Sequence, residues 1–310
     1  MSKPVLYIVF LLGSLLSFAQ QNLVPNGGFE DYTSCPLGIA DYTAAAWVLP
    51  TWGTSDYFNS CNLADAGIPS NFAGHQQAHS GFGYSGFGSC FEIPNQNSRE
   101  YLQVELMFPL ETGKEYAFSC FVSLAEVSKF CMKDVGIAVT NNPIGGSYVD
   151  PIPFLPYLES VSPDYICDTI NWVRLDIRFI ANGGEKFLTI GQFKNDADAD
   201  IFVRDSLMGG CAYYYIDDVS LMEYQSPEIP NVFSPNGDNL NDLWALDLPN
   251  GHEVKIFNRW GEMVNNGKTD HHAYSWDGKG ESGADCAEGV YFYTIEKNDF
   301  KKTGFIHLIR

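Results

Sequence analysis

Basic residues are scarce in this sequence. Its 310 residues include 18 Lys and Arg against 38 Asp and Glu, which gives a formal net charge of −20 at pH 7. A protein that binds nucleic acid needs a basic surface to neutralise phosphates. The composition therefore argues against nucleic acid as a partner, and it fits solubility and divalent cations better than anionic partners.

Long apolar runs and helical periodicity are also missing. No stretch beyond the N-terminus approaches the roughly 20 apolar residues that a membrane-spanning helix needs, and no long window repeats with a helical period. Aromatic residues make up 15% of the chain, with 29 Gly and 16 Pro. Such a composition is typical of short strands joined by tight turns, so we expect an all-β protein.

The eight cysteines include no CxxC pair, the spacing that many zinc sites use. In an exported chain they predict disulfides instead. Seven precede residue 225 and Cys286 follows it, so at least one thiol is free or one bridge joins two domains. Proximity in sequence favours Cys35–Cys61 and Cys120–Cys131.

Motifs for catalysis and nucleotide binding are incomplete. Residues 81–86 match GxGxxG but lack the flanking strand and helix of a dinucleotide site, so we expect a flexible loop there. His75 and His79 have HxxxH spacing without the Glu of a metalloprotease. We find no catalytic constellation and predict that the protein is not an enzyme.

The N-terminus has the pattern of a secretory signal peptide. Residues 1–19 combine Lys3, an apolar run at 5–12, and small residues at 17 and 19 where a signal peptidase cleaves. A membrane anchor is the alternative. We expect a signal peptide at 1–19, a first domain at 20–225, a Pro-containing linker at 226–229 and a second domain at 230–310.

Strand patterns fill the first domain. Residues 113–124 place Tyr116, Phe118, Cys120 and Val122 on one face, and residues 172–182 alternate cleanly between polar and apolar. Less regular runs occur at 99–110, 185–193 and 211–224. We expect a β-sandwich.

The two ends of this domain resemble a known family. "NLVPNGGFED" (22–31) and "YYYIDDVSL" (213–221) resemble the galactose-binding-like jelly rolls that include many carbohydrate-binding modules. The resemblance implies that the first and last strands are neighbours, with a structural Ca²⁺ beside them held by Glu30 and Asp217 or Asp218. The alternative is that Asp217 and Asp218 point to opposite faces and cap turns.

Aromatic residues among turn residues suggest a sugar-binding surface. They lie within 44–58 and 80–89, and rings on loops can stack on sugar faces while polar groups hold hydroxyls. We predict Trp52, Asp56, Tyr57 and Tyr84 as ligand contacts. Burial of the rings in the core is the alternative.

The second domain reads as another small β-unit, in which Val290, Phe292 and Thr294 face opposite to Tyr291, Tyr293 and Ile295. Its core is small, so truncating Trp260 or Phe292 would cost about 3–5 kcal/mol if either is buried. The segment "NGDNLND" can be interpreted as a calcium loop or as a run of Asx-turns.

Its motifs resemble a second family. "PNVFSPNGDNLNDLW", "VKIFNRWGEMV", "WDGK", "GVYFYTIE" and "KKTGFIHLIR" resemble the gliding-motility-associated C-terminal domains, type B sorting signals of the type IX secretion system in the Bacteroidota. The resemblance implies a small Ig-like β-sandwich, Sec export to the periplasm, and passage to the cell surface or medium. It implies as partners the outer-membrane machinery, a SprF/PorP-like protein and a PorV-type shuttle.

Together these observations predict a secreted or cell-surface, non-enzymatic binding protein with a glycan ligand. The alternatives are a structural surface protein or adhesin that binds proteins, and a β-sandwich hydrolase.

Overall fold

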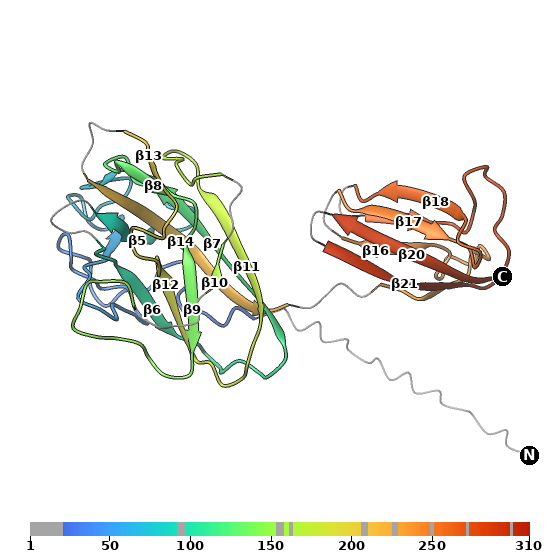
Figure 1. The fold of residues 1–310 in the computed structure, drawn as a ribbon, viewed down its shortest axis with the longest axis horizontal. Coiled ribbons are helices and arrows are strands. Elements are labelled where there is room, and N and C mark those ends of the chain that lie inside the picture. The colour runs from blue at the N-terminus through green and yellow to red at the C-terminus, as the bar shows by residue number, and fades with distance from the viewer. Residues whose placement is uncertain are drawn as a thin grey trace, which may run out of the picture. The chain divides into compact units, whose positions relative to one another are not determined.

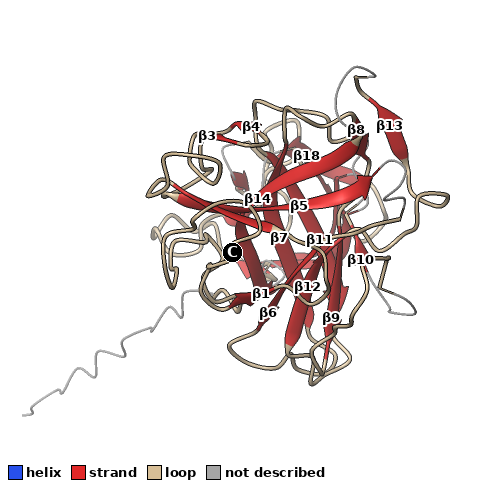
Figure 2. Cartoon of the chain, turned by 90° about the vertical axis from the view of Figure 1, so that its left-hand side faces the viewer, coloured by secondary structure: helices blue, strands red, loops and turns tan. Residues whose placement is uncertain are grey.

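The computed structural model describes residues 21–91, 97–152, 158–160, 164–205, 210–224, 229–248, 251–270, 273–297 and 300–310. The predicted signal peptide and most of the predicted linker lie outside these ranges. The chain divides into two compact units, Met1–Tyr224 and Gln225–Arg310, which are described separately. The described ranges contain strands and loops (Figure 2) and no helix of the length and apolarity that crossing a membrane takes.

Two five-stranded sheets form the N-terminal unit (Figure 1). One has the order β1 (Trp47–Val48), β6 (Tyr101–Glu105), β12 (Phe187–Gly191), β9 (Gly136–Thr140), β10 (Leu158–Glu159). The other has the order β11 (Val173–Ile180), β7 (Glu115–Leu124), β14 (Cys211–Glu223), β5 (Gly83–Phe91), β2 (Asp56–Asn59). Two short pairs, β3 (Ser70–Asn71) with β4 (Gly74–His75) and β8 (Phe130–Met132) with β13 (Ile201–Val203), complete the described strands.

The longer strands alternate between the two sheets along the chain, from β5 through β6, β7, β9, β11 and β12 to β14. This alternation is the jelly-roll arrangement, in which each strand contributes one face to the core between the sheets. The predicted all-β class and sandwich architecture are confirmed.

Side-chain alternation builds the core as the sequence predicts on two strands. On β7 the predicted face of Tyr116, Phe118, Cys120 and Val122 is buried. On β11 the apolar residues lie inward, and Leu175 pairs with Cys120 across the ladder. Because successive side chains of a strand point to opposite faces, polar neighbours such as Arg174 and Asp176 are left in solvent.

The glycine-rich segment of β5 was expected to be a flexible loop, and that prediction is wrong. Gly83–Phe91 is a buried strand between β14 and β2. A Cβ added at Gly86 would lie 2.5 Å from the Tyr213 hydroxyl, and one at Gly88 would lie 2.1 Å from the Phe91 ring. The glycines therefore make room for aromatic rings packed on the strand.

The N-terminal segment runs beside β14, the last strand of this unit. Leu23 N donates to Leu221 O and Val219 N donates to Gly27 O, each at 2.8 Å. A Cβ at Gly27 would lie 2.0 Å from Val219 O. The two ends of the unit are thus neighbours, as the resemblance implied, although the described part of the first segment is not itself a strand.

Two disulfides are present. Cys35–Cys61 confirms one prediction. The predicted Cys120–Cys131 bridge is wrong, because Cys131 pairs with Cys167. Cys120 points into the core from the middle of β7, whereas a hydrogen bond from Ile166 N to Met132 O brings the Cys167 segment alongside β8. Cys90, Cys120, Cys211 and Cys286 are free thiols.

The C-terminal unit is a smaller sandwich. Its larger sheet has the order β15 (Val232–Phe233), β21 (Phe300–Leu308), β20 (Gly289–Lys297), β17 (Glu253–Phe257), β18 (Met263–Lys268), and β16 (Trp244–Asp247) pairs with β19 (Ala273–Trp276). Trp244 and Trp276 are fully buried at its centre. Trp260 and Phe292 remain 72% and 48% exposed, so the large loss of stability expected for buried rings does not apply to them.

Candidate functional site

Two of the predicted ligand contacts lie in the core. Tyr57 on β2 and Tyr84 on β5 are both fully buried, and their hydroxyls donate to the carbonyls of Phe29 and Gln76 at 2.9 and 3.1 Å. Neither ring is available to stack on a sugar, so both assignments are corrected. The sequence was misleading because turn residues near these tyrosines predicted loops where the chain forms paired strands.

Asp56 is likewise a structural group. Its carboxylate accepts hydrogen bonds from Ala40 N at 2.6 Å and from the Tyr213 hydroxyl at 2.5 Å, and the side chain is almost fully buried. Burial raises the pKa of this carboxyl above its usual range. The prediction that Asp56 contacts a ligand is corrected as well.

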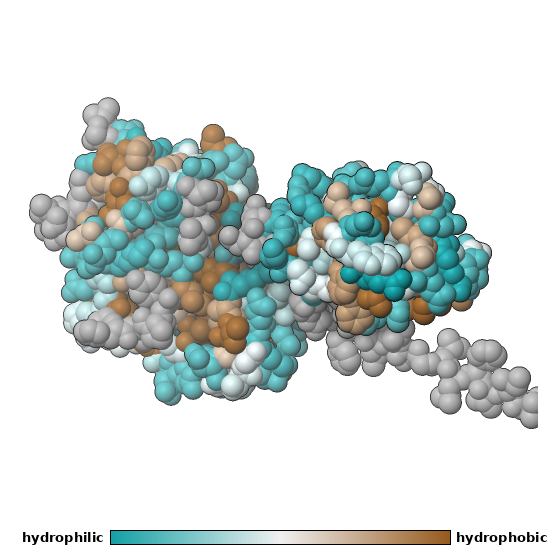
Figure 3. All heavy atoms as spheres, turned by 45° about the vertical axis from the view of Figure 1, so that its right-hand side comes forward, coloured by the Kyte–Doolittle hydropathy of each residue, from teal (hydrophilic) through white to brown (hydrophobic). Residues whose placement is uncertain are grey.

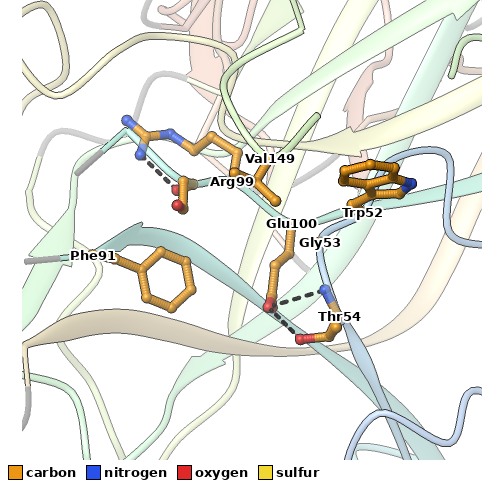
Figure 4. Close-up of a pocket in the computed structure, with 8 residues that line it drawn as sticks. Trp52, Gly53, Thr54, Phe91, Arg99, Glu100 and Val149 are labelled. Carbon is orange, nitrogen blue, oxygen red and sulfur yellow. Dashed lines mark hydrogen bonds between the residues drawn. The ribbon is translucent and has the colours of Figure 1, made fainter. Parts of the chain in front are cut away.

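Trp52 has the surface position that the sequence predicted. Its side chain is 68% exposed and lines a cavity of about 270 Å³ together with Thr54, Phe91, Arg99, Glu100 and other residues (Figure 4). The cavity forms where the segment after β1 approaches the segment before β6. A Cβ at Gly53 would lie 2.6 Å from Arg99 O, so glycine permits this approach.

Glu100 is the acidic group of this cavity, and sequence reasoning missed it. One carboxyl oxygen accepts from Gly88 N at 2.7 Å, and the other lies 3.3 Å from both the amide and the hydroxyl of Thr54. In Figure 4 the side chain points toward Thr54. Burial raises the pKa of Glu100 to about 7, only partly offset by these donors. The carboxyl group can therefore donate or accept a hydrogen bond near neutral pH.

Arg99 shapes the same cavity from its buried side. The side chain is fully buried, its Nη2 atom lies 2.7 Å from Asp196, and it also donates to the carbonyls of Ser98 and Lys194. These partners satisfy most of the guanidinium. We assign Arg99 to holding the cavity wall in place.

The three predicted calcium ligands converge on one turn. Asp217 accepts hydrogen bonds from the amides of His79 and Ser80, and Asp218 accepts from the Ser80 hydroxyl at 2.7 Å and contacts His79 Nδ1 at 2.5 Å. Glu30 accepts from Phe82 and Gly83 N–H groups nearby. The three carboxylates therefore connect both ends of the unit to residues 79–83.

Burial raises the pKa of Asp217 to about 8, with the charge of Asp218 adding to the effect. Both oxygens of Asp217 and of Glu30 accept backbone N–H groups, which a cation would have to displace or share. Across the described ranges, no three His, Cys, Asp or Glu side chains are grouped so as to hold a metal ion. The carboxylates suit a hard cation by type, while their present partners are protein donors.

The "NGDNLND" segment is closed by its own side chains. Asp242 accepts from the amides of Gly237 and Asn239 at 2.7 and 2.8 Å, and Asp238 accepts from Leu240 N at 2.7 Å. These are the Asx-type turns of the simpler interpretation.

Comparison with known proteins identifies one part of the chain. Residues 227–308 match the family described as CHU_C Type IX secretion signal domain, and no curated protein matches the sequence. Such a signal domain implies export to the cell surface or the extracellular space.

Among solved structures, similar ones include the CBM22-1 xylan-binding domain of Xyn10C from Paenibacillus barcinonensis (12% identity, 67% of this chain and 97% of that one, TM-score 0.36). Another is the K1 cleaved adhesin domain of Lys-gingipain from Porphyromonas gingivalis (13% identity, 64% and 96%, TM-score 0.32). At these scores nothing about ligand or activity follows from the likeness. Residues 227–308 of this chain belong to the CHU_C type IX secretion signal domains.

Proposed function

We propose that this protein is a secreted or cell-surface carbohydrate-binding protein, and that its N-terminal unit takes a glycan at the Trp52 cavity. The observation that carries the proposal is the pairing of an exposed indole with the buried carboxyl group of Glu100 and the exposed hydroxyl of Thr54 in one concave site. Trp52 offers an apolar face, and Glu100 and Thr54 offer polar atoms in the same cavity (Figure 4).

This combination suits a sugar. A pyranose ring has an apolar face that packs on an aromatic ring and hydroxyls that need partners at its edge. The cavity volume of about 270 Å³ lies near the lower end of the roughly 300–1,000 Å³ of small-molecule sites. We therefore expect recognition of a short stretch or an end of a glycan.

A glycan array with the full mature chain tests the proposal. We expect at least one polysaccharide to bind, and Trp52→Ala to weaken that binding by about thirtyfold, as truncation of an aromatic anchor does. Phe82→Ala is the matched control, because Phe82 is also 68% exposed but lies outside the cavity. Absence of binding to every glycan, or equal loss in both variants, would overturn the proposal.

We also propose that the site does not cleave its ligand. Glycoside hydrolysis ordinarily uses two carboxyl groups that flank the bond, and among the described residues that line the cavity one carries a carboxyl group, Glu100. Incubation of the purified protein with the glycans that it binds should yield no shorter products. Release of reducing ends would favour the hydrolase alternative.

Calcium beside Glu30, Asp217 and Asp218 remains a proposal. The oxygen chemistry of these carboxylates, each of which contacts residues 79–83, supports it, and these side chains would hold the ion, which would neutralise their charge. An ion that binds only the folded state adds about 2.7 kcal/mol at a hundredfold excess over its Kd. EGTA should lower the melting temperature of the N-terminal unit, and added Ca²⁺ should restore it. Asp217→Ala with Asp218→Ala should remove this sensitivity, and a wild-type melting curve that ignores EGTA would reject the ion.

For export, we propose that a SprF/PorP-like outer-membrane protein and a PorV-type shuttle handle the C-terminal unit. The family match supports the machinery as a whole. Strains that lack each of these two components separately should retain the chain in the cell, and normal export from either strain would remove that component.

A further inference from the structure

The C-terminal unit carries apolar side chains on both faces of its larger sheet. The inward face supplies the core, with Tyr291, Tyr293 and Ile295 of β20 buried. On the outward face, strand register aligns Met263, Phe257, Phe292 and Phe305 in one row across β18, β17, β20 and β21. Packing of the core accounts for the inward face only.

This row is open to solvent. Met263, Phe292 and Phe305 are 46%, 48% and 51% exposed. In Figure 3, tan and brown residues, which are the hydrophobic ones, interrupt the teal hydrophilic surface of this unit. A contiguous apolar area of this kind marks an interaction surface more often than chance exposure does.

A turn between β17 and β18 places the exposed side chain of Trp260 beside the row. Trp260 is 72% exposed, and the Asn258 side chain accepts hydrogen bonds from Trp260 N and Glu262 N at 2.9 and 3.0 Å. Gly261 follows with φ of +81°, a conformation that glycine adopts without strain. The backbone that presents the indole is therefore fixed before any partner arrives.

Trp260 lines a pocket of about 410 Å³ with Arg259, Val290, His307 and Glu288 among its other walls. Val290 pairs with His307, and Phe292 pairs with Phe305 two residues further along the two strands, on the same face of the sheet. The pocket therefore adjoins the exposed row. We call Phe257, Trp260, Met263, Val290, Phe292 and Phe305 the aromatic face.

The charges around the aromatic face are unevenly paired. Lys268 lies 3.1 Å from Glu253 and Lys301 lies 2.8 Å from Glu296. Arg259 instead lies over the Trp260 ring at 4.5 Å, and it has no carboxylate within ion-pair distance in the described part of the chain. A carboxylate of a partner protein could form an ion pair with Arg259, while the pocket accepts an aromatic or aliphatic side chain of that partner.

We propose that the aromatic face is the surface through which a protein of the type IX machinery binds this chain. The partner has an apolar protrusion for the pocket and a carboxylate for Arg259. This inference rests on the proposed function of the C-terminal unit as an export signal. It adds which face of the unit is recognised and by what chemistry.

Export of the full chain from its producing cells tests the inference. We expect Phe292→Ser with Phe305→Ser to lower the exported amount more than tenfold, because exposed anchors carry much of an interface's affinity. Leu240→Ser, at a residue that is 70% exposed in the same unit but outside the face, should export normally. The melting temperature of each purified chain is measured as well, because Phe292 and Phe305 are only about half exposed and their loss lowers stability; export is compared only for variants that remain folded at the growth temperature.

Trp260→Ala is a second variant, at an exposed turn residue outside the strands. It tests the aromatic face even if the double variant fails to fold. A photo-crosslinking residue at position 292 should form an adduct that mass spectrometry identifies as a type IX machinery protein, and one at position 240 should not. Wild-type export of folded Trp260→Ala and Phe292→Ser/Phe305→Ser chains would overturn the inference. An adduct with a second copy of this chain would do the same. If the chain that lacks residues 230–310 is also exported normally, the export function itself fails.

Discussion

The fold buries the carboxyl group of Glu100, and burial disfavours its ionised form. Its pKa rises from 4.5 to about 7, so between these values the folded state binds a proton that the unfolded state has released. The contribution of Glu100 to stability is therefore greatest below about pH 4.5 and falls as pH rises toward 7. Asp217, with its pKa raised to about 8, acts in the same direction.

Glu100→Gln should remove part of this dependence. The amide can donate to the Thr54 hydroxyl and keep its oxygen on Gly88 N, although it loses the contact from Thr54 N–H that the carboxyl oxygen accepts. Between pH 4.5 and 7.5 the free energy of unfolding of the N-terminal unit should fall by about 3 kcal/mol less in the variant than in the wild type, from about 1.36 kcal/mol per pKa unit. Urea titrations at both pH values measure this, with Glu126→Gln at an exposed acid as the control. Parallel pH profiles for all three proteins would contradict the assignment.

The sequence predicted the exposure of Trp52 but not the residues around it. The ligand-contact interpretation requires an exposed ring, and Trp52 is 68% exposed. Tyr57 and Tyr84 look similar in sequence, yet a strand partner that is distant in sequence buries each of them. Glu100 gave no signal, because its burial depends on Gly88 and Thr54, residues in other segments.

At the level of elements, alternation of polar and apolar residues predicted a strand correctly where one face of that strand is exposed to solvent. β7 and β11 follow the predicted pattern because their outer faces meet solvent. β5 is buried on both faces and is rich in glycine, so it has no alternation to read. The pairing of Cys131 with Cys167 likewise depends on a loop that returns to β8.

The Cys131–Cys167 bridge should stabilise the N-terminal unit strongly. It closes a sequence separation of 36 residues, for which chain entropy gives about 4 kcal/mol. Cys131→Ser with Cys167→Ser should therefore lower the urea midpoint of this unit, and reductant should have little further effect beyond the Cys35–Cys61 bridge. The control is Cys211→Ser, which removes a free thiol. Equal midpoints for the wild type and the double variant would show that the bridge adds no stability.

At the scale of the whole molecule, the two units have separate cores. We expect a chain that lacks residues 230–310 to fold and to keep its glycan binding, since each sheet of the N-terminal unit is completed by its own strands. It should remain in the periplasm, because the export signal has been removed. Fractionation followed by a binding assay on the periplasmic extract checks both expectations. Appearance of the shortened chain at the surface would contradict the signal assignment.

Both units place their latest strand inside a sheet. β14 lies between β7 and β5, and β21 lies between β15 and β20. Neither sheet can be completed until that strand has been synthesised, because it is the strand that joins its two neighbours. A chain that ends before residue 300 therefore has an incomplete larger sheet in its C-terminal unit, in which β15 has no strand beside it. The order of the strands makes completion of this sheet wait for the last strand of the unit to be synthesised.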